Sequence, residues 1–96
     1  MLEKVKLALR IRHTQLDGEI LDTIEAGRRE MVRAGVSEAA AYDPSLDLVS
    51  AALITYCKAV YASDKTMAEK YQESWKYQLD CLRKSAGYRV EVSEDV

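Results

Sequence analysis

The segment Leu48–Ala62, with the sequence LVSAALITYCKAVYA, decides the fold of this chain because Lys58 is its only charged residue. A helix made of these residues is apolar around nearly its whole circumference, and such a helix is normally enclosed by other elements. We predict that it extends from about Pro44 to Ala62, with Asp43 as the N-cap and Pro44 at the first helical position.

Two opposite faces of this helix have different expected neighbours. One face repeats apolar residues at helical spacing and is assigned to the core of the chain: Leu46, Val49, Leu53, Tyr56 and Val60. The other face carries Ala51, Ile54 and Tyr61 around Lys58, whereas a surface facing water would carry more charge. A domain of this size buries a modest share of its surface, so we expect sister copies of the chain to cover this second face.

A second amphipathic helix is predicted upstream, from about Gln15 to a C-terminal cap at Gly35. Thr14 and Asp17 have the spacing of a capping box at its start. Glycine weakens a helix interior, so Gly27 within the apolar face indicates a close crossing with another helix. The apolar stripe comprises Leu16, Ile20, Ile24, Gly27 and Met31, and it is widened by Leu21 and Val32.

Two further helices complete the prediction. A short one lies in LEKVKLALRI, residues 2–11, and a longer one follows the turn SDKT, with Thr66 and Glu69 as a capping box and Gly87 at its end. Tyr77 and Cys81 lie off the apolar stripe of the longer helix and are candidates for contact with another chain. The two stripes are Leu2, Val5 and Leu9 in the short helix, and Met67, Tyr71, Trp75, Leu79 and Leu82 in the longer one.

Together these elements predict an all-α fold, a small bundle of three main helices plus a short N-terminal helix. We expect one helical domain over residues 1–88 and a flexible tail over residues 89–96, RVEVSEDV. The tail is expected to be disordered in the isolated protein, with addition to the sheet edge of a partner as the alternative. The segment 36–42 is expected to be a connector between two helices.

Composition excludes several classes of function. The 14 basic and 16 acidic residues nearly cancel, which argues against a general binder of nucleic acid or membranes. No apolar run approaches the roughly 20 residues that span a bilayer, and the first residues lack the pattern of a signal peptide, so we expect a cytosolic product. Cys57 and Cys81 are expected to lie too far apart for a disulfide and to be free thiols.

Motifs for catalysis, metal binding or cofactor binding are not found. His13 is the only histidine, neither cysteine belongs to a CxxC pair, and no phosphate-binding or hydrolase motif occurs. The acids at the start of the second helix, Asp17, Glu19, Asp22 and Glu25, are explained by the helix dipole. No cofactor and no metal are therefore expected. Arg10 and Arg12 have fewer acidic neighbours than Arg28 and Arg29, so they are the candidates for a charged contact with a partner.

The order of several sequence blocks resembles that of the head-tail connector, or adaptor, proteins of long-tailed double-stranded-DNA bacteriophages, also described as phage DNA-packaging proteins. The resemblance covers about residues 2–88 and rests on the order and length of the elements. The blocks are LEKVKLALRI, HTQLDGEI, LDTIEAGRREM, DPSLDLVSAALITYCKAVYA and AEKYQESWKYQL.

This resemblance implies a structural protein of the virion and not an enzyme. It would form a homo-oligomeric ring of about twelve copies beneath the portal protein, extend the DNA channel, and dock a downstream connector or tail-completion protein. DNA would pass through the lumen without specific binding. Assembly would take place in the cytoplasm of the bacterial host, and the place in the virion would be the head-tail interface. Ala51, Ile54, Tyr61, Tyr77 and Cys81 are then candidates for subunit contacts.

Two other functions are weighed against this one. A small helical DNA-binding or regulatory protein would use Arg10, Arg12, Arg28 and Arg29 on phosphates. An enzyme would need an unrecognised carboxylate site, for which the sequence offers no indication.

Overall fold

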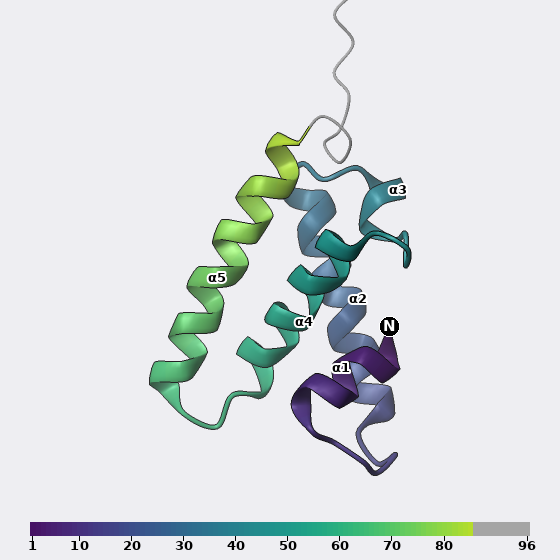
Figure 1. Cartoon of the computed structure of the whole chain (residues 1–96), viewed down its shortest axis with the longest axis vertical. Coiled ribbons are helices and arrows are strands. Elements are labelled where there is room, and N and C mark those ends of the chain that lie inside the picture. The colour runs from purple at the N-terminus through teal and green to yellow at the C-terminus, as the bar shows by residue number, and fades with distance from the viewer. Residues whose placement is uncertain (86–96) are drawn as a thin grey trace, which may run out of the picture.

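The computed structural model describes residues 1–85 and confirms an all-α architecture (Figure 1). Its helices, in chain order, are α1 (Leu2–Leu9), α2 (Asp17–Ala34), α3 (Glu38–Ala41), α4 (Asp47–Tyr61) and α5 (Lys65–Lys84). Four of them correspond to the predicted elements, and α3 was not predicted. Gly87 and the tail 89–96 lie outside the described residues, so the predictions made for them stay predictions.

Helix α4 lies in the middle of the bundle and packs against α1, α2 and α5 (Figure 1). Its side chains Val49, Ala52, Leu53 and Cys57 are fully buried. The chain thus encloses most of its most apolar helix by itself, to a greater extent than the sequence predicts. The assignment of Val60 to the core is wrong, because the side chain is 53 % exposed near the end of α4.

Helix α2 supplies the second half of the core. Its predicted stripe is confirmed, since Ile20, Ile24, Gly27 and Met31 are buried. A Cβ atom on Gly27 would lie 2.9 Å from Cδ2 of Leu53, so the glycine permits the close crossing of α2 and α4. Gly35 ends the helix with φ 114°, as predicted for a C-terminal cap. Leu21 does not widen the buried face, because it is 50 % exposed.

The capping box predicted at the start of α2 is wrong, and the first acid of the helix has a partner in another helix. The N-cap is Leu16, and no side chain caps the helix, so Thr14 and Asp17 do not form a capping box. The carboxylate of Asp17 lies 2.8 Å from Nζ of Lys6 in an ion pair. This pair joins the start of α2 to α1, and the Lys6 side chain is only 10 % exposed.

The starts of α4 and α5 also differ from the predicted caps. Helix α4 begins at Asp47, and the Asp43 carboxylate accepts hydrogen bonds from the backbone and hydroxyl of Ser45. Proline therefore belongs to a turn before the helix. The N-cap of α5 is Asp64, whose carboxylate accepts a bond of 2.8 Å from the backbone N–H of Thr66. Aspartate caps a helix at least as well as threonine, and it comes first along the chain.

Helix α3 lies in the segment expected to be a connector, and contacts with α2 hold it there. Ala40 and Ala41 are buried, and the Arg28 guanidinium donates a hydrogen bond to the carbonyl oxygen of Ala41. The Tyr42 hydroxyl donates a bond of 2.7 Å to the Glu25 carboxylate. That bond lowers the pKa of Glu25 and raises the pKa of Tyr42. The segment therefore contains a short helix that packs on α2 of the same chain.

Helices α4 and α5 are antiparallel neighbours, as the short connection predicts (Figure 1). The Tyr56 and Trp75 rings pack between them with centroids 4.8 Å apart. Both cysteines are free thiols, as predicted. Burial raises the pKa of the Cys57 thiol to about 11, so it is protonated and unreactive near neutral pH.

Candidate functional site: an apolar groove between α4 and α5

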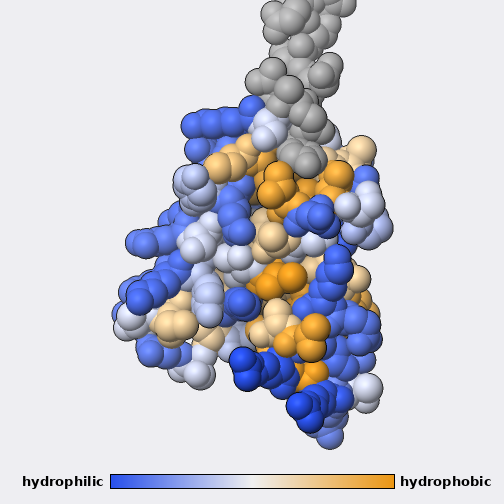
Figure 2. Space-filling model, viewed as in Figure 1, coloured by the Kyte–Doolittle hydropathy of each residue, from blue (hydrophilic) through white to orange (hydrophobic). Residues whose placement is uncertain are grey.

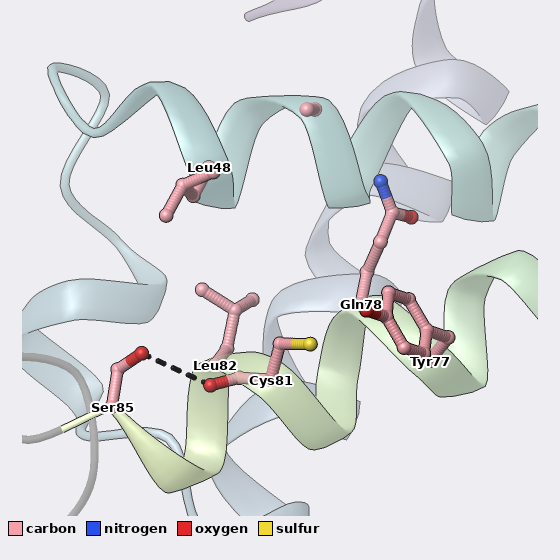
Figure 3. A pocket seen from close by; sticks show the side chains of 7 residues that line it. Leu48, Tyr77, Gln78, Cys81, Leu82 and Ser85 are labelled. Atoms are coloured by element: carbon pink, nitrogen blue, oxygen red, sulfur yellow. Dashed lines mark hydrogen bonds between the residues drawn. The ribbon is translucent and has the colours of Figure 1, made fainter.

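The beginning of α4 and the end of α5 leave a groove of about 180 Å³ between them. Figure 3 shows Leu48 of α4 pointing toward Leu82 of α5, with Cys81, Gln78 and Tyr77 following along α5. None of the described residues that line the groove is charged. The complete lining is Leu48, Ala51, Tyr77, Gln78, Cys81, Leu82 and Ser85.

Helical spacing places these side chains along the groove. Leu48 and Ala51 are three residues apart on α4, and Tyr77 and Cys81 are four residues apart on α5, so each pair shares one helix face. Leu82 is buried in the core and forms the floor. Leu48 remains 59 % exposed and Tyr77 remains 72 % exposed, so both rims present apolar surface to water.

The groove has the chemistry of a protein-binding surface. Large exposed apolar side chains, side by side on two helices, favour contact with apolar side chains of a partner. The side-chain oxygen of Gln78 is buried without a hydrogen-bond partner among residues 1–85. The Ser85 hydroxyl is engaged, because it donates to the carbonyl oxygen of Cys81 (Figure 3).

Three of the five predicted interface residues meet in this groove: Ala51, Tyr77 and Cys81. Ile54 and Tyr61 do not, since both are partly buried and pack against the core of their own chain. Leu48 was not singled out from the sequence. Its signal was its position three residues before Ala51, within a helix already recognised as apolar on more than one side.

The arginines divide into two groups, as predicted. Arg28 and Arg29 have partners on their own chain: Arg28 contacts the Ala41 carbonyl and the Tyr42 ring, and Arg29 forms an ion pair with Glu25. Arg10 and Arg12 are exposed and form no ion pair with any residue in the range 1–85.

On one face of the molecule, polar and apolar side chains occupy separate regions of the surface. Figure 2 shows hydrophobic atoms gathered along the middle of the molecule, over α4 and α1, beside the hydrophilic flank formed by α5.

No helix within residues 1–85 combines the length and apolar character needed to cross a bilayer. In the same range, no three His, Cys, Asp or Glu side chains are grouped to hold a metal ion.

Comparison with known proteins identifies the family. The family model of the phage connector proteins matches residues 1–89, which is nearly the whole chain. Comparison with curated proteins and with solved structures gave no match. The family match confirms the resemblance drawn from the order of the sequence blocks. The chain therefore belongs to the phage connector protein family, a family of structural proteins.

Proposed function

We propose that this protein is a head-tail connector that assembles as a ring beneath the portal of a phage head. The ring extends the DNA channel and offers a docking surface to a downstream connector or tail-completion protein. The observation that carries the proposal is the apolar groove between α4 and α5, which a chain of the connector family leaves uncovered. A neighbouring copy of the chain covers this groove in the assembly.

A ring needs two different surfaces on each copy, because its subunits contact one another head to tail. The groove is one of them. Leu7 on α1 is a candidate for the other, since it is 81 % exposed. Ile54, Tyr61 and the charged pair Arg10 and Arg12 remain candidates for contacts at the edges of this interface or with the portal.

Burial of the groove supplies enough free energy for assembly by repetition. Covering a large apolar side chain such as Leu48 or Tyr77 contributes roughly 1.5–3 kcal/mol. Each subunit in a closed ring makes two such interfaces, so contacts that are weak in a pair hold a ring together. A copy number of about twelve follows from the family resemblance, and the place of the ring is the head-tail interface of the virion.

The charge of the described residues suits a channel through which DNA slides. Of the 14 basic and 16 acidic residues, one basic and three acidic residues lie in the range 86–96, which leaves 13 of each sign in residues 1–85. A balanced surface lacks the positive potential that makes proteins hold DNA tightly. The alternative of a DNA-binding regulator has no such support, because Arg28 and Arg29 are engaged within the chain.

The test is a single charge placed in the groove. Tyr77→Asp replaces an exposed side chain of α5 and places a carboxylate where the neighbouring copy would pack. As a control, Gln72→Asp introduces a carboxylate at another exposed position of α5. Electron microscopy of wild type and both variants, with and without portal protein, measures the outcome. Wild type and Gln72→Asp should form rings or decorate portals, and Tyr77→Asp should do neither. Salt-sensitive DNA binding by a wild-type protein that ignores the portal would favour the regulator instead.

A further inference from the structure

The most exposed large hydrophobic side chains within residues 1–85 lie on two separate surfaces. Leu7 of α1 is 81 % exposed, Tyr77 of α5 is 72 % exposed, and Leu48 of α4 follows with 59 %. Tyr77 and Leu48 border the groove, whereas Leu7 shares a shallow surface depression with Ile11 and Arg12. The described part of the chain thus carries an apolar groove and, elsewhere, an apolar side chain that stands in water.

Helix α1 is fixed to the body of the protein, so the exposure of Leu7 is built into the fold. Val5 is fully buried in the core, and Nζ of Lys6 lies 2.8 Å from the carboxylate of Asp17 on α2. A helix turns by about 100° per residue, so Leu7 points away from the face that carries Val5. The chain therefore presents Leu7 to a partner without any change in the packing of α1.

Leu7 cannot fill the groove of its own copy. The end of α1, with Leu9 and Arg10, lies beside Lys58 near the end of α4, whereas the groove lies beside Leu48 at the beginning of α4. Leu48 and Lys58 are separated by about 15 Å of helix, at ~1.5 Å of rise per residue. Figure 1 shows α1 in the lower half of the view, and the beginning of α4 and the end of α5 in the upper half.

The groove has the size and chemistry for a leucine side chain. Its volume is about 180 Å³, and an apolar cavity of roughly 150 Å³ holds a benzene molecule, which has more carbon atoms than a leucine side chain. None of the described lining residues is charged. One contact between Leu7 and the groove would remove the three most exposed large hydrophobic side chains of residues 1–85 from water together.

Charges beside the two surfaces also match. Asp47, in the first turn of α4 beside the groove, is exposed and forms no ion pair with any residue in the range 1–85. Around Leu7, the cations Lys4 and Arg12 outnumber the acid Glu3, and none of these three forms an ion pair in that range. An acid beside the groove and an excess of cations beside Leu7 favour one relative orientation of two copies.

We propose that Leu7 of one copy inserts into the groove of the next copy, between Leu48 and Tyr77 and beside Cys81. This inference rests on the proposed function, because it names the side chain that fills the groove within the ring. The two surfaces differ and lie at opposite ends of the subunit. Each copy therefore offers Leu7 to one neighbour and its groove to the other, which is the head-to-tail contact that a ring requires.

The first test uses the thiol that the groove already contains. Cys81 is exposed and Cys57 is buried, so Leu7→Cys adds one reactive thiol on α1. Diamide oxidises two neighbouring thiols to a disulfide and takes up the two electrons and two protons that they lose. Cysteines whose Cα atoms are more than about 7 Å apart cannot be bridged. Non-reducing electrophoresis of Leu7→Cys should show a series of linked copies, and mass spectrometry should place each link between positions 7 and 81.

Two variants serve as controls for this cross-link. Leu21→Cys is the matched control, because Leu21 is 50 % exposed on α2 and lines neither surface. It should give no series of linked copies, and neither should Leu7→Cys/Cys81→Ser. Links only between two thiols at position 7 would indicate contact between identical surfaces and would overturn the proposal. Absence of the series under conditions in which the wild type assembles would also overturn it.

Assembly of Leu7→Asp separates failure of this contact from failure of the proposed function. Sedimentation velocity should show association weakened by about tenfold or more, with the circular dichroism of wild type, whereas Leu21→Asp should associate like wild type. If the wild type forms rings and Leu7→Asp forms them equally well, the inference about Leu7 is wrong and the proposed function stands. If the wild type forms no ring and decorates no portal, the proposed function itself is wrong.

Discussion

The two ends of helix α4 carry opposite kinds of open surface. Its beginning, with Leu48 and Ala51, borders a groove whose described lining has no charge. Its end, with Lys58, borders an open cleft whose described lining includes Arg10 and Lys58 and no acidic side chain. Between them, Leu53 and Cys57 are enclosed by the other helices. A single apolar helix thus contributes to the core and to two open surfaces of different chemistry, one bordered by Leu48 and the other by Lys58.

The largest effect is expected in the enclosed middle of α4. Leu53→Ala should lower the free energy of unfolding by about 2–5 kcal/mol, because it leaves a cavity beside Gly27 in the core. Leu48→Ala removes the same side chain at the groove, where it is 59 % exposed, and should cost under about 1 kcal/mol. Denaturant unfolding of both variants measures the difference. Equal losses of stability would contradict the statement that the middle of α4 belongs to the core whereas its beginning is exposed.

The next effect concerns assembly and not stability. Tyr77→Asp should weaken subunit association at least tenfold, because it replaces roughly 1.5–3 kcal/mol of apolar burial by a carboxylate that must lose water. Circular dichroism should remain that of wild type, since the side chain is 72 % exposed. Sedimentation velocity over a range of concentrations measures the association. An unchanged association constant would remove the groove from the interface.

Whether the sequence predicts a feature of the fold depends on how many residues contribute to the pattern that indicates it. The stripe of α2 and the crossing at Gly27 follow from periodicity, which many residues repeat. The predicted N-caps were wrong because a few residues decide them: Asp64 precedes Thr66 as the N-cap of α5, and Asp17 forms an ion pair with Lys6 on α1. Such contacts between distant segments leave no periodic pattern.

Helix α3 and the groove show the same limit. Four residues are too few for a periodic signal, and α3 depends on the bond from Arg28 to the Ala41 carbonyl, 13 positions away. For the groove, Ala51, Tyr77 and Cys81 could be singled out as apolar residues off the main stripes. Ile54 shares that property and yet packs on the core, because the rotation of α4 between its neighbours is a property of the whole bundle.

Lowering the pH should destabilise α3 and leave the groove unaffected. The Tyr42 hydrogen bond lowers the pKa of Glu25 below its ordinary value of 4.5. The stabilisation from this bond is therefore fully present above pH 4.5 and is lost as the pH falls through the lowered pKa. Amide hydrogen exchange at Ala41 should therefore accelerate between about pH 5 and pH 3, relative to the exchange expected for an unstructured peptide. In Tyr42→Phe this acceleration should be smaller, whereas an identical pH profile would show that the pair does not hold α3.

The smallest effect is expected at the cationic end. Lys58→Met keeps a long side chain near the Tyr71 ring of α5 and removes a charge that has no ion-pair partner in residues 1–85. The free energy of unfolding should change by no more than about 0.5 kcal/mol, and subunit association should stay as in wild type. Thermal unfolding and sedimentation test both statements. Loss of assembly in this variant would mean that the cleft, and not only the groove, lies between subunits.

The most direct test of the account is the mass of the particle formed by the wild-type protein and by Tyr77→Asp, each measured alone and beside portal protein. The account predicts a multi-subunit ring for the wild type and single copies for the variant. The claim that a second copy covers the groove at the beginning of α4 would be contradicted by either of two results. One is a wild-type protein that stays a single copy under both conditions, and the other is a variant that forms the same particle as wild type.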